Sequence, residues 1–188
     1  GYELGVRSAI VPGLHSVLAL WRLDLGSELV FVGDAGSTEP SFPSRRSGIE
    51  WANYWTPTPA LIVDADLALS RARYTGAEAA LAGGRHVPGA LEKSFSAGAT
   101  YDSQARWTVG LRLRYFGPRA LVEDNSVRSG ASTLVNARFG YRVAPGSSLS
   151  VEVLNLFDRR VSDIDYYYAS QLRGEAQPVE GIHTHPAE

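Results

Sequence analysis

The feature that most restricts the fold of this chain is a two-residue alternation of apolar and polar side chains. It is clearest from Arg106 to Phe116, where one parity is apolar and the other carries arginine, threonine and glycine. Successive side chains of a strand point to opposite faces, so this segment has one apolar and one polar face. A helix would distribute the same residues around its whole circumference. The segment therefore predicts a β-strand that separates two different environments.

The alternation recurs along the chain and predicts about eight strands, each about ten residues long. The expected strands are 2–10, 15–25, 46–55, 61–70, 91–101, 106–116, 135–143 and 149–153. Short turns rich in Pro, Gly, Asp and Ser follow every other strand, at 12–13, 57–59, 102–104 and 145–147. Long polar stretches follow the others, at 26–44, 75–88, 118–132 and 159–188. Antiparallel up-and-down order then places all short turns at one rim and all long connections at the other.

Strand length favours a membrane protein over a soluble one. A ten-residue strand is about 33 Å long, and tilted by about 40–45° it rises roughly 24 Å, close to the apolar band of about 25 Å in an outer-membrane barrel. Strands of soluble proteins average about 5–6 residues, which argues against the alternative of a soluble β-sandwich or a lipocalin-like cup. Aromatic residues near the strand ends suit the headgroup level. They are Tyr2, Trp51, Trp55, Tyr74, Tyr101, Trp107, Tyr115, Phe139, Tyr141 and Phe157.

Composition excludes several classes of protein. The 188 residues contain no cysteine, which rules out disulfides, thiolate metal sites and a cysteine nucleophile. The net charge of −2 gives no indication of a nucleic-acid partner. The longest apolar run, Val17–Trp21, is far shorter than a transmembrane helix of about 18–20 residues. Because residue 1 is Gly and the chain lacks methionine, we expect a processed chain or a piece of a longer one.

Few residues suggest chemistry. Asp64 and Asp66 share a strand face, and we interpret them as part of a polar wall that pairs with facing arginines, with Arg112, Arg114, Arg138 and Arg142 as candidates. No nucleophile–histidine–acid set and no phosphate-binding loop is visible, so we expect no enzyme, no catalytic residue and no cofactor.

The last long connection holds the candidate ligand contacts. His183 and His185 form a His-x-His pair near Asp163 and Asp165, but a histidine pair without a third ligand is weak, and we expect no metal site. Tyr166, Tyr167 and Tyr168 either stack on a planar ligand or mark the headgroup belt, and we favour the belt. The candidate ligand contacts in this connection are therefore Tyr166, Tyr167, Tyr168, His183 and His185.

Two motifs resemble TonB-dependent outer-membrane receptors. The segment Ser150–Arg160 carries the family's Asn-Leu-Phe-Asp signature in Asn155, Leu156, Phe157 and Asp158, on the expected next-to-last strand. The segment Arg45–Asn53, followed by Trp55 and Pro57, resembles the family's Arg-x-x-Gly-x-Glu pattern, where a strand descends to a periplasmic turn.

The resemblance implies an all-β fold, a partial antiparallel up-and-down transmembrane β-barrel. Residues 1–188 would be its C-terminal portion, with no plug domain, no closing strand and two unpaired edges. It implies a part of an active-transport receptor in the outer membrane of a Gram-negative bacterium, taking up a ferric siderophore, cobalamin or a similar scarce solute. The implied partners are the lipid bilayer, the plug, TonB and the solute, and no nucleic acid. The alternatives are a complete small eight-stranded barrel with a structural or adhesive role and an outer-membrane barrel hydrolase.

Overall fold

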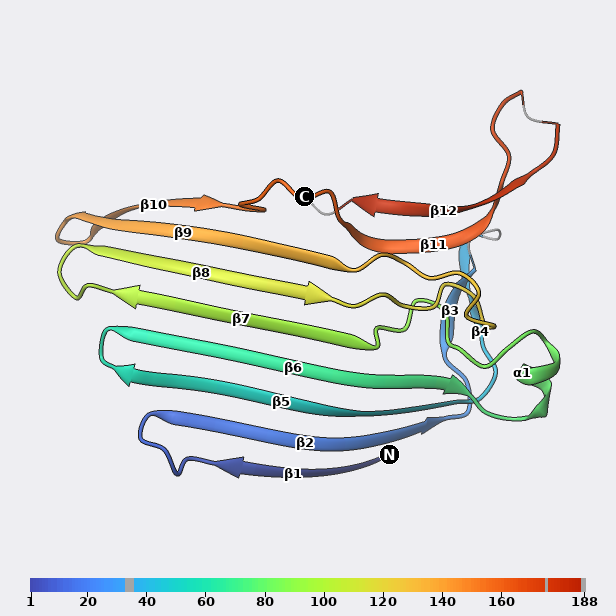
Figure 1. The fold of residues 1–188 in the computed structure, drawn as a ribbon, viewed down its shortest axis with the longest axis horizontal. Coiled ribbons are helices and arrows are strands. Elements are labelled where there is room, and N and C mark those ends of the chain that lie inside the picture. The colour runs from blue at the N-terminus through green and yellow to red at the C-terminus, as the bar shows by residue number, and fades with distance from the viewer. Residues whose placement is uncertain (33–35, 175, 187–188) are drawn as a thin grey trace.

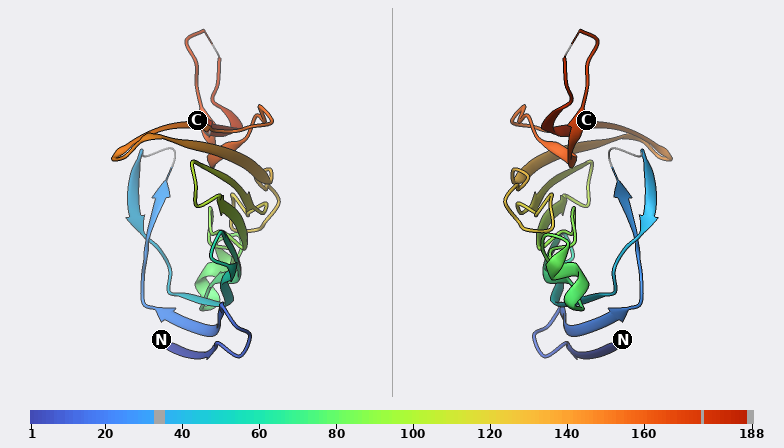
Figure 2. Two further views of the ribbon diagram at one scale, coloured as in Figure 1. Left: turned by 90° about the vertical axis from the view of Figure 1, so that its left-hand side faces the viewer. Right: turned by 90° about the vertical axis from the view of Figure 1, so that its right-hand side faces the viewer.

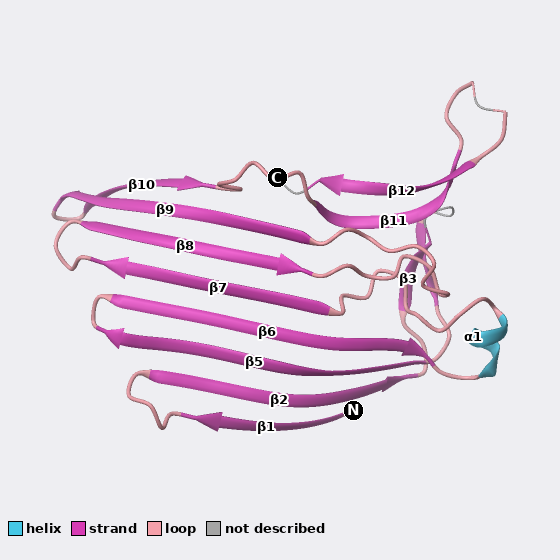
Figure 3. Ribbon diagram, viewed as in Figure 1, coloured by secondary structure: helices cyan, strands magenta, loops and turns pink. Residues whose placement is uncertain are grey.

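The computed structural model describes residues 1–32, 36–174 and 176–186, and most of its regular structure is β (Figure 3). Eight strands form one antiparallel sheet in the order β1-β2-β5-β6-β7-β8-β9-β10 (Figure 1). This confirms the predicted all-β, antiparallel architecture with eight main strands. Their bounds are β1 (Tyr2–Ser8), β2 (Leu14–Leu25), β5 (Ser44–Thr58), β6 (Leu61–Tyr74), β7 (Lys93–Asp102), β8 (Trp107–Phe116), β9 (Ser132–Ala144) and β10 (Ser147–Val153).

The short turns all lie at one end of the sheet and the long connections at the other, as the sequence predicted (Figure 1). At two of the short turns, Gly13 and Gly146 have positive φ angles of 74° and 76°. Glycine adopts this conformation without steric cost, so the chain reverses there in a tight turn. These two turns join β1 to β2 and β9 to β10, which pair antiparallel.

The long connections contain regular structure that the alternation did not predict. Residues 26–44 include the hairpin β3 (Leu29–Val32) and β4 (Ser37–Pro40), and residues 159–188 include β11 (Ser162–Ser170) and β12 (Val179–Pro186). We predicted these stretches as long polar connections, and the two hairpins within them were not predicted. Between β6 and β7 lies a five-residue helix, α1 (Ala77–Leu81). The consecutive tyrosines of β11 break the two-residue pattern, which hid this strand in the sequence.

The two faces of the main sheet differ in chemistry. The outer face carries an apolar band that includes Leu20, Trp51 and Leu111, whose side chains are 47%, 48% and 52% exposed. At the end with the short turns, Trp55, Tyr101, Trp107 and Tyr141 border this band. The accessible surface is 12,563 Å², whereas a compact monomer of this mass exposes about 8,800 Å². The chain therefore presents an apolar face that a soluble sandwich would bury.

The sheet is curved and open. Figure 2 shows its curvature, with β3–β4 standing across from the central strands at the end with the long connections. Among the described residues, β1 and β10 each pair with one neighbour only, so they form the two predicted free edges. A closed eight-stranded barrel would require β1 to pair with β10. This topology argues against the alternative of a complete small barrel.

A small buried cluster lies where the long connections meet β6. It consists of Ala72, Tyr74, Ala79 and Val87. Tyr74 is only 4% exposed, so our expectation that it belongs to the aromatic belt was wrong. Its position on the inner parity of β6 turns its ring toward the connections, where it makes an edge contact with Phe42.

Candidate ligand-binding surface

The inner face of the sheet is a polar wall with cross-strand ion pairs. Arg112 Nη2 donates to Asp64 Oδ1 at 2.9 Å, and Arg142 Nη2 donates to Asp102 Oδ2 at 2.8 Å. The first pair confirms the predicted partnership of Asp64 with a facing arginine. It reaches across β7 because Gly98 lies between the two side chains, where a Cβ atom would come within 2.6 Å of Asp64 Oδ1. Glycine at this position therefore keeps the ion pair possible.

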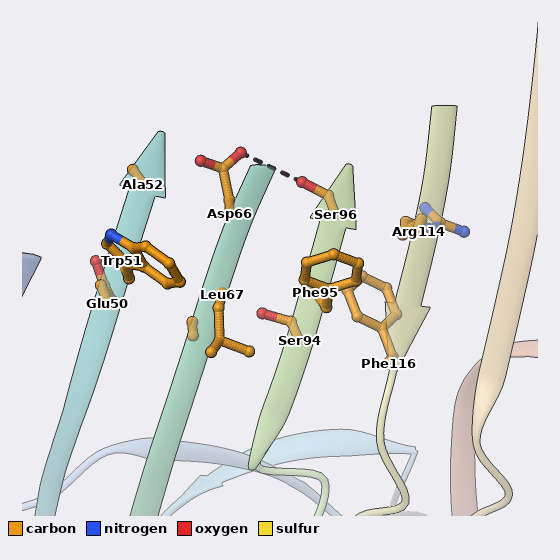
Figure 4. Close-up of a pocket in the computed structure, with 11 residues that line it drawn as sticks. Glu50, Trp51, Ala52, Asp66, Leu67, Ser94, Phe95, Ser96, Arg114 and Phe116 are labelled. Carbon is orange, nitrogen blue, oxygen red and sulfur yellow. Dashed lines mark hydrogen bonds between the residues drawn. The ribbon is translucent and has the colours of Figure 1, made fainter. Parts of the chain in front are cut away.

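A pocket of about 380 Å³ opens on β5, β6, β7 and β8. Figure 4 shows Asp66, Ser96 and Arg114 on three successive strands of this pocket, and Ser96 Oγ donates to Asp66 Oδ2 at 3.3 Å. Glu50 and Ser94 also line it. Its polar groups include both carboxylates and a guanidinium, so it offers hydrogen-bond donors and acceptors to a polar solute that passes along the wall.

The β11–β12 hairpin brings four of the five predicted ligand contacts to one face. The Tyr168 ring stacks on His183 with centroids 3.9 Å apart, and Tyr166 makes an edge contact with His185 at 6.1 Å. Tyr167 lies on the opposite face, where its hydroxyl donates to Glu180 at 2.8 Å. The hairpin is separate from the main sheet, and the assignment of these tyrosines to the headgroup belt stays a prediction.

The hairpin is anchored on the inner side of the sheet. Arg114 Nη2 donates to Asp163 Oδ1 at 2.9 Å, and Arg119 Nη2 donates to the Asp163 carbonyl oxygen at 2.6 Å. From β3, the Phe31 ring packs against Tyr166 with centroids 4.5 Å apart. These contacts join three segments that are distant in the sequence. Phe31 was not predicted, because nothing in its local sequence distinguishes it from an ordinary strand residue.

Two buried polar atoms of the hairpin lack a hydrogen-bond partner. They are Nε2 of His183 and Oδ1 of Asp165, and Asp165 is only 5% exposed. The two side chains lie on opposite faces of the hairpin, because His183 is paired with Tyr166 and Asp165 with Thr184, so they do not form one site. The described residues contain no group of three or more His, Asp or Glu side chains that could hold a metal ion.

Two carboxylates fasten the long connections to the sheet. Glu28, between β2 and β3, accepts hydrogen bonds from Arg46 and Ser44, and Glu92, before β7, accepts one from Arg128 at 2.7 Å. Burial alone would raise the pKa of each carboxyl group. The hydrogen bonds from these partners more than offset burial, and they hold both pKa values below the ordinary one.

The Asn-Leu-Phe-Asp motif forms a turn rather than part of a strand, since β10 ends at Val153. Our placement of the motif on the next-to-last strand was wrong for this reason. Asn155 has a φ of 49°. Its side-chain amide closes the turn by bonding both backbone groups of Arg159. Its Nδ2 donates to the Arg159 carbonyl at 2.9 Å, and its Oδ1 accepts from the Arg159 amide at 2.9 Å. Leu156 and Phe157 are exposed at 41% and 65%, so the motif acts locally as a structural turn.

Comparison with known protein families shows to which family this curved, two-faced sheet belongs. Residues 1–156 match the family model described as TonB dependent receptor-like, beta-barrel. The chain belongs to the TonB-dependent receptor family. This family consists of outer-membrane transport receptors and is not an enzyme class. No curated protein matches the chain.

Several solved structures of import receptors and transporters share the fold. The ferric-catecholate import receptor Fiu of E. coli K12, in its closed form, is 25% identical with a TM-score of 0.67, over 85% of this chain and 23% of Fiu. The siderophore receptor PiuA of Acinetobacter baumannii is 16% identical with a TM-score of 0.70, over 98% of this chain and 26% of PiuA. The copper transporter OprC is 19% identical with a TM-score of 0.62, over 84% of this chain and 25% of OprC.

The chain therefore spans about a quarter of the length of these solved receptors. In the described part of the chain, no helix is long and apolar enough to cross a membrane.

Proposed function

We propose that this chain forms part of the barrel wall and long loops of a ligand-gated importer in the outer membrane of a Gram-negative bacterium. The observation that carries the proposal is the two-faced curved sheet, apolar outside and lined with ion pairs inside. Lipid offers no hydrogen-bond partners, so only a sheet closed by further strands can cross it. In this proposal residues 1–188 are the C-terminal portion of the barrel. A plug domain and TonB, which delivers energy from the inner membrane, are partners of the whole protein.

The orientation follows from the connections. Outer-membrane barrels have short periplasmic turns and longer extracellular loops. The end with β3–β4, α1 and β11–β12 is therefore extracellular in this proposal, and the end with Gly13 and Gly146 is periplasmic. The solute would first meet the connections and then pass along the polar wall.

The proposed solute is a ferric siderophore. Fiu and PiuA are named as a ferric-catecholate import receptor and a siderophore receptor, which supports this cargo class, while OprC is named as a copper transporter. The chain's own support is the hairpin face of Tyr166, Tyr168, His183 and His185, whose stacked rings suit an aromatic chelate. Tyr167 is excluded from this contact set because it points to the other face.

Uptake measurements test the proposal. We expect a strain without the gene to lose uptake of at least one radiolabelled ferric siderophore, and the gene to restore it. A Tyr168→Ala, His183→Ala variant should bind that siderophore about tenfold more weakly, since an aromatic contact contributes about 0.5–1.5 kcal/mol. A Tyr167→Phe variant is the matched control and should bind like the wild type. Unchanged uptake of ferric siderophores and cobalamin by the deletion strain would contradict the function.

A further inference from the structure

One glycine of the inner wall is required neither by the backbone nor by its neighbours. Gly110 lies inside β8, which pairs with β7 and β9 without a bulge, and its φ angle is not positive. A Cβ atom there would lie 3.5 Å from Thr100 Oγ1, an ordinary contact, whereas at Gly140 it would come within 2.5 Å of Thr108 Oγ1. Glycine weakens a strand interior, and where no bulge or bend explains it, it marks a place that another group approaches closely. Gly110 therefore indicates such an approach to the wall.

An arginine without an ion-pair partner lies beside this glycine. Arg138 of β9 is directly opposite Gly110 in the register, and its side chain is exposed on the polar face. Glu152 of β10 is its register partner on the other side, yet the eight ion pairs of the described residues do not include Arg138. Arg112 and Arg142, in contrast, are each bound to an aspartate. The guanidinium of Arg138 is therefore available to a further anionic group.

Gly110 and Arg138 line one cavity of about 330 Å³ on the inner face. Its other polar side chains include Thr100, Thr108 and Glu152. The two hydroxyls and the guanidinium of Arg138 can all donate hydrogen bonds, whereas Glu152 is the only carboxylate in the lining. A second cavity of about 220 Å³ on the side of the short turns is also lined by Arg138. Donors thus predominate around the glycine, which favours an anion over a cation.

We propose that the cavity lined by Gly110, Arg138, Thr100 and Thr108, which we call the Arg138 site, binds a carboxylate group of the transported solute. A guanidinium binds a carboxylate through two parallel N–H···O bonds, and the missing side chain of Gly110 lets the carboxylate reach the wall. The nearby Glu152 repels a dianion such as phosphate more strongly than a monoanionic carboxylate.

The inference rests on the proposed function and narrows its cargo. It predicts a ferric chelate that carries carboxylates and is therefore anionic. In the proposed orientation, the Arg138 site lies on the periplasmic half of β8, because Gly110 is three residues from the strand end at Trp107 and six from the end at Phe116. The solute would reach it after leaving the β11–β12 hairpin, so the wall would contain a second binding position along the same path.

The test uses the whole protein as its gene encodes it, purified in a non-ionic detergent, with citrate as the probe and isothermal titration calorimetry as the readout. Triethyl citrate, which has the same skeleton without ionised carboxylates, should not bind. The variants are Arg138→Gln and Gly110→Ala, whose added methyl group fits the wall but fills the floor of the site. The control is Arg160→Gln, an exposed arginine outside the site.

We expect the Kd for citrate to rise at least tenfold in both variants and to stay unchanged in the control, since a hydrogen bond to a charged group contributes about 1.5–3 kcal/mol. The heat-modifiable folded form on electrophoresis shows that the variants are folded. Equal citrate binding by the wild type and either variant would overturn the inference, and so would equal binding of triethyl citrate.

A wild type that binds no citrate would also overturn the inference, because another part of the whole protein would then cover the site. Uptake separates this result from a failure of the proposed function. If the deletion strain loses ferric siderophore uptake but the purified protein binds no citrate, only the Arg138 site is contradicted. If the deletion strain keeps its uptake, the function itself is contradicted.

Discussion

At the scale of single residues, Asn155 shows how one side chain holds a turn of the wall. It combines a positive φ with two hydrogen bonds to Arg159. Alanine at this position would lose both bonds and strain the backbone, at about 0.5–1.5 kcal/mol per bond and about 1–2 kcal/mol for the left-handed conformation. We expect Asn155→Ala to lower the free energy of unfolding by about 2–5 kcal/mol in urea titrations in lipid vesicles. Asn155→Gly also removes both hydrogen bonds, but glycine adopts the positive φ without strain, so the free energy of unfolding should fall by about half as much. Equal decreases in the two variants would contradict this explanation.

Also at the scale of single residues, the carboxyl group of Glu28 makes the stability of the folded protein depend on pH. Its pKa is lower in the folded protein than its ordinary value of 4.5, so below that value the unfolded chain takes up more protons than the folded one. The stabilisation is complete above about pH 4.5 and is lost as the pH falls through the folded pKa. We expect limited proteolysis between β2 and β5 to accelerate on acidification below pH 4.5. The Glu28→Gln variant should be cleaved faster than the wild type at neutral pH, and its cleavage rate should rise less on acidification. A rise as steep as that of the wild type would contradict the role of Glu28.

At the scale of the element, the proposed function predicts that β6 separates lipid from water. Leu67 and Ala68 are consecutive, so they lie at the same depth on opposite faces, and Ala68 is paired in register with Glu50. We expect Leu67→Arg to cost about 2–4 kcal/mol of folding free energy in a bilayer, whereas Ala68→Arg, beside Glu50 on the polar face, should cost far less. The yield of the heat-modifiable folded form on electrophoresis measures both. Equal yields would indicate that the two faces meet the same environment.

The elements also show what the sequence could reveal. The main strands could be predicted because one apolar and one polar face of the sheet give a clean alternation in the sequence, as in β8. The β11–β12 hairpin could not be predicted, because contacts with the connections select its residues and both of its faces are only partly exposed. For the candidate site, Tyr166, Tyr168, His183 and His185 could be named from residue type. Their partners Phe31 and Asp163 could not, since those contacts depend on how distant connections fold together.

At the scale of the whole molecule, the two free edges govern how this chain behaves alone. β1 and β10 each present a row of backbone groups that the described residues do not pair. Such edges join other strands, so we expect the isolated 188-residue chain, refolded in detergent, to associate into species larger than a monomer. Analytical ultracentrifugation with density-matched detergent measures this. A monodisperse monomer at micromolar concentration would contradict the expectation.

The separation of short turns from long connections has a consequence for evolution. Tight turns such as those at Gly13 and Gly146 leave no room for insertion without shifting the register of two strands. Beyond the other rim, insertions, deletions and recombination can alter whole hairpins while the lipid-facing rows stay intact. Receptors with this architecture can therefore diversify their cargo on one side of the membrane while the turns at the opposite rim remain constrained.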